Sequence, residues 1–127
     1  MKIDKATRQY LRGKPEAECD FPFGPDVEVY KVKGKMFATL GYEDGLARIN
    51  LKCDPGEALI LRDMLDSVLP GYHMNKKHWN TVLLDDSVPS KEVERQIDRS
   101  YALVVKKLPK TIRSSLELRF GTADLYR

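Results

Sequence analysis

Cysteine, histidine and tryptophan are scarce in this chain, and their scarcity excludes several kinds of site. The 127 residues include two cysteines, two histidines and one tryptophan. Cys19 and Cys53 have neither the close spacing of a zinc or redox motif nor the abundance of a disulfide scaffold. We therefore expect reduced thiols, as in a cytoplasmic protein, and we expect no cofactor.

Long apolar runs are also missing. The longest, such as residues 58–61 and 102–105, are far shorter than the roughly 20 residues needed to span a bilayer. The N-terminus becomes charged at once, at Lys2 and Asp4, and so lacks the apolar core of a secretion signal. We expect no membrane association. Neither repeats nor linkers interrupt the chain, which predicts a single domain over residues 1–127.

The net charge of +3 is small, but it is unevenly distributed. Residues 1–66 carry 11 basic and 12 acidic side chains, whereas residues 67–127 carry 11 and 7. No acidic residue occurs between Asp66 and Asp85. A local basic patch of this kind attracts polyanions, although so small a net charge would not retain one at high salt.

The carboxylate-free stretch contains the most informative segment, residues 70–80, whose sequence is PGYHMNKKHWN. Both histidines, the only tryptophan and an adjacent pair of lysines lie within it. Cationic donors bind phosphate, and flat aromatic rings stack on bases, so the segment indicates a nucleic-acid contact. The alternative is that it seats an aromatic side chain in the protein's own core.

Individual residues of this segment have distinct expected roles. Lys76 and Lys77 are candidate phosphate contacts, and Asn75 can bond a phosphate or a base edge. A solvated turn is the alternative for all three. Tyr72 is the more plausible exposed stacking residue, whereas Trp79 either stacks on a base or anchors the core.

The two histidines do not form a convincing metal site. His73 and His78 are five residues apart, which fits neither one helix face nor alternate positions of one strand. They also lack the three or four convergent ligands of a zinc site. We expect no metal, and we expect the imidazoles to hydrogen-bond in a structured turn and assist anion binding when protonated.

A second basic surface is predicted on the strands. Lys33 and Lys35 flank a hairpin glycine, while Arg48 and Lys52 share the polar face of one strand. Together with Lys31 they would form a wing-like surface against a DNA backbone. The alternative is an ordinary solvated sheet face.

Strand patterns are concentrated in the first half of the chain. Residues 27–32 lead through Lys33-Gly34 into residues 36–40, which is typical of a tight hairpin. Residues 47–52 alternate between apolar and polar side chains. These three strands predict an antiparallel meander, and residues 79–84 predict a further strand.

Helix signals surround the meander. A short helix is expected over residues 5–12 with Asp4 as its N-cap, and a second begins after Asp54 and continues to residue 69. Glu57 occupies the capping-box position of this second helix. The longest helix is expected over residues 90–108.

The longest helix is also the clearest. Ser90 is its expected N-cap. Val93, Ile97, Tyr101 and Val104 recur at helical spacing and predict its buried face. Residues 111–127 show only a poor pattern for one more short helix. Helices that flank an antiparallel meander predict an α+β fold of two layers, with helices packed on one face of the sheet.

Catalytic residues are not evident. Cys53 lies on the apolar side of its strand, where no neighbouring group in the sequence would activate the thiol. Ser100 is expected to be a small packing residue, and Asp85 and Asp86 to be solvated at a turn. The glycines form hairpin turns and not a phosphate-binding loop. We therefore expect a protein that is not an enzyme.

Several motifs occur together in one order: PFG at 22–24, GKMFA at 34–38, LKCDP at 51–55, the 70–80 segment, and SYALV at 100–104. Together they resemble the MmcQ/YjbR family of small bacterial proteins. The resemblance implies a compact α+β fold similar to that of type III secretion chaperones. It also implies DNA binding, for which a double-wing arrangement has been suggested in the family. Fold alone does not fix function.

The leading hypothesis is a noncatalytic protein that binds double-stranded DNA mainly through its phosphates, with little sequence specificity. No helix is dense enough in Arg, Asn and Gln to read the major groove. The expected contact residues are Tyr72, His73, Asn75, Lys76, Lys77, His78, Lys33 and Lys35. The alternative is a protein-interaction or chaperone-like module that uses a patch of Tyr72, Met74 and Trp79.

Overall fold

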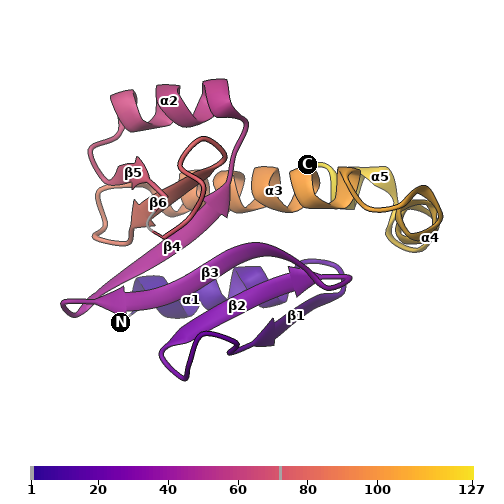
Figure 1. Cartoon of the computed structure of the whole chain (residues 1–127), viewed down its shortest axis with the longest axis horizontal. Helices are drawn as coiled ribbons and strands as arrows, with labels where there is room; N and C mark the ends of the chain where they lie inside the picture. The colour runs from indigo at the N-terminus through magenta and orange to yellow at the C-terminus, as the bar shows by residue number, and fades with distance from the viewer. Residues whose placement is uncertain (1, 72) are drawn as a thin grey trace.

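A computed structural model describes residues 2–71 and 73–127, with side chains from residue 5 onward. The strands are β1 (Ala17–Asp20), β2 (Val27–Val32), β3 (Lys35–Glu43), β4 (Leu46–Lys52), β5 (Val68–Pro70) and β6 (Trp79–Leu83). The helices are α1 (Lys2–Arg12), α2 (Pro55–Met64), α3 (Ser90–Lys106), α4 (Lys110–Phe120) and α5 (Thr122–Leu125). The expected α+β fold, with an antiparallel sheet, is confirmed (Figure 1).

The sheet is built around the predicted meander. Its strand order is β1-β2-β3-β4-β6-β5, and every neighbouring pair is antiparallel. The hairpin between β2 and β3 turns at Lys33 and Gly34, which have φ angles of 51° and 80°. Two consecutive residues of positive φ are the geometry that a tight two-residue hairpin requires.

Helix α3 packs across the sheet as its apolar spacing predicts. Its contacts are mainly with β3 and β4, and Val93, Ile97 and Tyr101 are buried. The expected N-cap at Ser90 is wrong, because Ser90 is the first helical residue and the preceding Pro89 makes no side-chain capping bond. The cap expected at Asp4 is also wrong, because α1 already begins at Lys2.

Helix α2 is joined to α3 on the same side of the sheet. Asp54 caps α2 as expected, accepting hydrogen bonds from the backbone N–H groups of Gly56 and Glu57 at 3.1 and 3.4 Å. The Glu57 carboxylate pairs with Arg95 and Arg99 of α3 at 3.2 and 3.0 Å. Glu57 therefore links two helices in addition to holding its capping-box position.

The prediction that the second helix continues to residue 69 is wrong. Helix α2 ends at Met64, and Val68 pairs with Val82 in the edge strand β5. The hydroxyl of Ser67 donates to the carboxylate of Asp85 at 2.7 Å, which fixes the chain against the end of β6. Asp85 is thus a structural acceptor, and hydrogen bonds from Ser87 and Ser67 lower the pKa of its carboxyl group.

The C-terminal residues form two helices where one short helix was expected. Leu116 of α4 and Leu125 of α5 are buried against the core. The hydroxyl of Tyr126 donates to Glu117 at 2.7 Å and joins the two helices. No helix within the described residues is long and apolar enough to cross a membrane.

A β-bulge at Phe37 brings strand β3 into contact with α3. Tyr30 pairs with Ala38 and Lys31 with Met36, which leaves Phe37 without a partner in β2. The Phe37 ring packs edge-on against Tyr101 of α3, with 5.2 Å between ring centroids. A bulge turns the extra residue and its carbonyl away from the regular ladder.

Ser100 joins this bulge to the next strand. Its buried hydroxyl donates to the Phe37 carbonyl at 2.6 Å and accepts from the backbone N–H of Lys52 at 2.8 Å. Ser100 is therefore a hydrogen-bonding link between α3, β3 and β4, beyond the packing role predicted for it.

Replacing Ser100→Ala should lower the free energy of unfolding by about 2–4 kcal/mol, because it leaves one buried carbonyl and one N–H without a partner. Urea denaturation measures this change. The exposed Ser115→Ala substitution in α4 is the matched control and should change stability little. Equal stability of the two variants would show that water replaces the Ser100 hydroxyl at no cost.

Candidate functional site

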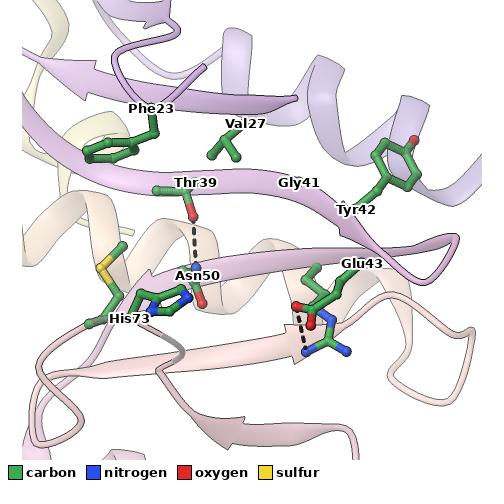
Figure 2. Close-up of a pocket in the computed structure, with 10 residues that line it drawn as sticks. Phe23, Val27, Thr39, Gly41, Tyr42, Glu43, Asn50 and His73 are labelled. Atoms are coloured by element: carbon green, nitrogen blue, oxygen red, sulfur yellow. Dashed lines mark hydrogen bonds and ion pairs between the residues drawn. The ribbon is translucent and has the colours of Figure 1, made fainter. Parts of the chain in front are cut away.

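The face of the sheet opposite α3 carries a groove between two loops. Thr39 of β3 lies opposite Asn50 of β4 in the register, and Gly41 lies opposite Arg48. The β1–β2 loop contributes Phe23 to one side of the groove, and the β5–β6 loop contributes side chains to the other. The groove has a volume of about 430 Å³ (Figure 2), within the usual range for small-ligand sites.

Polar side chains on the floor of the groove are fixed by one another. The Asn50 side-chain Nδ2 donates to the Thr39 hydroxyl at 2.9 Å, and the Thr81 hydroxyl donates to Asn50 Oδ1. Arg48 and Glu43 form a long ion pair of 3.6 Å. The floor thus offers a cationic donor and an anionic acceptor beside a fixed amide.

The walls are mostly apolar. Phe23 is 67% exposed and lies over Thr39, while His73 lies across the groove beside Asn50 (Figure 2). Gly41 leaves part of the floor without a side chain. A Cβ on Gly41 would lie 3.6 Å from Cγ2 of Val27, in ordinary contact, so the position has room that the native residue does not fill.

The β5–β6 loop is held in place by Arg62 of α2. Its Nε donates to Oδ1 of Asn80 at 2.7 Å, and its Nη2 donates to the carbonyls of Trp79, at 3.2 Å, and of Lys76. The base of the loop closes at Gly71, where a Cβ would lie only 2.7 Å from Cβ of Trp79. The Pro-Gly pair therefore marks a close approach of two strands, and not the end of a helix.

The tip of this loop presents the predicted phosphate contacts. The backbone N–H of Lys77 donates to Oδ1 of Asn75 at 3.0 Å, which shapes residues 75–77 into a turn. The side chains of Asn75, Lys76 and Lys77 are exposed. In the described part of the chain, no carboxylate forms an ion pair with either lysine. Both charges are therefore available to a ligand.

The histidines lie at opposite ends of the loop. His73 is exposed and has a φ of 58°, a left-handed conformation that is uncommon outside glycine and often marks functional sites. His78 is half-buried, and its carbonyl accepts from the backbone N–H of Cys53 at 2.8 Å. Among the side chains that the structure describes, in residues 5–71 and 73–127, no three His, Cys, Asp or Glu residues gather in a possible metal site. Tyr72 lies outside the described residues.

Trp79 is a buried residue, with an exposed fraction of 9%. It does not form the exposed patch that the alternative protein-interaction hypothesis requires. Of the other members of that patch, Met74 is half-buried and lines the groove.

The second basic surface is largely neutralised by ion pairs. Lys31 pairs with Asp20 at 3.1 Å. Lys33 pairs with Glu16 at 2.7 Å, and Glu16 also pairs with Arg119 of α4 at 2.6 Å. Arg48 pairs with Glu43 on the floor of the groove.

Two lysines of the second basic surface, Lys35 and Lys52, do not take part in these ion pairs. Lys35 is exposed beside the β2–β3 turn, which lies close to α4 and far from the β5–β6 loop (Figure 1). Lys52 is half-buried, and burial, followed by the charge of Lys107, lowers the pKa of its amine. The structure therefore brings His73, Asn75 and the lysines of residues 76–77 together in one loop, but places Lys33 and Lys35 elsewhere.

Reasoning from the sequence missed Phe23, Thr39 and Asn50 as groove residues, although it singled out His73, Met74 and Arg48, which also line the groove. Phe23 stands in a Pro- and Gly-rich turn, and an aromatic side chain in such a turn is the one local signal for it. Thr39 is a polar residue in an apolar strand and Asn50 lies on the polar side of an alternating strand, but only the register shows that they are opposite one another.

Comparisons with known proteins agree with this fold. The chain matches the model of the YjbR family over residues 12–103. It is 40% identical over 96 residues to the protein YbdF of Escherichia coli O157:H7, covering 76% of this chain and 79% of that one. It is 34% identical over 108 residues to YjbR of Escherichia coli K12, covering 85% and 92%.

A solved structure is similar over most of the chain. A Deinococcus radiodurans protein of domain family DUF419 has a TM-score of 0.82 and 37% identity, covering 89% of this chain and 86% of that one. From the extent of the family match and the identity to its relatives, the chain belongs to the YjbR family.

Proposed function

We propose that this protein is a noncatalytic DNA-binding protein whose β5–β6 loop contacts phosphates. The observation that carries the proposal is a contrast between lysines. On the β1–β2–β3 side of the sheet, Lys31 and Lys33 are paired with carboxylates at 3.1 and 2.7 Å. At the tip of the β5–β6 loop, Lys76 and Lys77 are exposed and have no such partner among the described residues.

The loop also has the geometry that a phosphate contact needs. Arg62 fixes the carbonyls of Lys76 and Trp79, so less backbone entropy is lost when a ligand binds. Asn75 uses its Oδ1 within the turn, which leaves its amide N–H groups free to donate. Contacts to phosphate position a protein on DNA without reading its sequence, so this loop supports affinity more than specificity.

The absence of catalysis is part of the proposal. Burial raises the pKa of the Cys53 thiol to about 11, so the thiolate needed for nucleophilic attack is scarce at neutral pH. Cys19 and Cys53 are both free thiols, which supports a cytoplasmic setting.

The double substitution Lys76→Glu with Lys77→Glu should weaken binding to duplex DNA strongly while the protein stays folded. Each phosphate contact that is lost should also reduce the slope of log affinity against log salt by about 0.9. Fluorescence anisotropy with a labelled duplex at several salt concentrations measures both quantities, and thermal melts check the fold.

The matched control is Lys91→Glu with Lys110→Glu, which makes the same change in net charge at exposed positions of α3 and α4. It should alter affinity far less. Wild-type protein that binds no duplex at low salt would contradict the proposal. Unchanged binding by the Lys76/Lys77 variant would assign the contact to another surface, with Lys35 as the next candidate.

Arg62→Met tests whether the loop must be held in place. The substitution keeps an unbranched apolar stem but removes every donor, leaving the buried Oδ1 of Asn80 without its Arg62 bond. We expect a loss of about 1–3 kcal/mol in stability, faster amide exchange in residues 75–79, and weaker DNA binding. Full affinity in this variant would show that the loop does not need Arg62 to bind.

A further inference from the structure

We propose that the groove on the uncovered face of the sheet holds one unstacked nucleobase, so that the protein prefers DNA that is single-stranded at the β5–β6 loop. This inference rests on the proposed function, because the bound DNA supplies the base. Lys76 and Lys77 do not line the groove, which is formed by strands β3 and β4, the β1–β2 loop and the first residues of the β5–β6 loop.

The side chains along the walls of the groove can stack against a flat ring. The phenyl ring of Phe23 stands on one side and the imidazole of His73 on the other (Figure 2), and Met74, the residue after His73, also lines the groove. Bases stack on aromatic side chains regardless of their identity, because every base has a π-face. Thr39 and Asn50 lie between these walls (Figure 2), and the missing side chain at Gly41 leaves open floor next to them, where Val27 adds apolar contact.

Polar groups on the floor of the groove can pair with the edge of a base. Arg48 carries N–H donors of the kind that pair with ring nitrogens and carbonyl oxygens, and Glu43 carries an acceptor for exocyclic amines. Their mutual ion pair is long, at 3.6 Å, so a ligand has room to compete for both groups. Because the Arg48–Glu43 pair is neutral overall, the floor carries no net positive charge to attract a phosphate and suits an uncharged base.

The phosphates then belong at the loop tip, which gives the groove and the loop complementary roles. His73 and Met74 line the groove, and the next residues along the chain are Asn75, Lys76 and Lys77. A strand that inserts a base beside His73 therefore passes its negatively charged backbone close to the two free lysines. A duplex can do this only by unpairing and flipping a base, which predicts a preference for single strands.

Anisotropy with a labelled single strand and its duplex, about 12 nucleotides long, tests the groove. Phe23→Ala should weaken single-strand binding about 5- to 100-fold, the range for losing one base–aromatic stack, and leave duplex binding unchanged. Gly41→Val, which fills the floor, should act in the same direction. Phe21→Ala is the matched control, because Phe21 is 50% exposed in the same loop but does not line the groove.

The outcomes separate this inference from the proposed function. If Phe23→Ala and Gly41→Val bind a single strand as the wild type does, while the Lys76/Lys77 variant binds neither form, the base site is overturned and phosphate binding stands. If no strand of either form binds, the proposed function fails, and adenosine monophosphate tests the groove alone. A shift of the Gly41 amide NMR signal would then assign the groove to free nucleotides, and an unmoved signal would overturn the base site.

Discussion

The sheet is covered by helices on one face only, and the candidate site depends on this constraint. Alternate residues of each strand point to opposite faces. In β4, Ala47, Ile49 and Leu51 are buried toward α3, so Arg48 and Asn50 must lie on the other face. Within the described residues no helix covers that face (Figure 1), and the β1–β2 and β5–β6 loops form the sides of the groove there instead. Because the helices pack on one face of the sheet, that face forms the core. The opposite face keeps the polar side chains on the floor of the groove accessible.

The β5–β6 loop gains its position from contacts made outside the loop. Arg62 of α2 donates to Asn80 and to two carbonyls, and Gly71 allows the two ends of the loop to approach closely. Ion pairs neutralise Lys31 and Lys33, whereas Lys76 and Lys77 remain without carboxylate partners in the described chain. The contacts that hold the β5–β6 loop and the unpaired charges of its lysines therefore both favour this loop as the place where a ligand binds. The proposed DNA contact relies on this loop, and the proposed base contact relies on the groove beside it.

Sequence patterns predicted the long elements and missed features that depend on distant residues. Alternation over residues 47–52 and helical spacing from Val93 identified β4 and α3, because burial on one face imposes a period. Strands β1 and β5 span only four and three residues, too few for a pattern to show. Lys33 forms an ion pair with Glu16, and Phe23 and His73 line the same groove from opposite sides, although each pair of residues is far apart in the chain. Tertiary structure alone establishes such pairs.

Photo-crosslinking tests the central claim, that the uncovered face of the sheet contacts the ligand, most directly. A single-stranded oligonucleotide carrying 5-iodouracil would be irradiated with the wild-type protein, and the modified residue would be located by mass spectrometry. The account predicts an adduct on Phe23, His73 or Met74, which line the groove. An adduct confined to α1 or α4, on elements that do not line the groove, would contradict it.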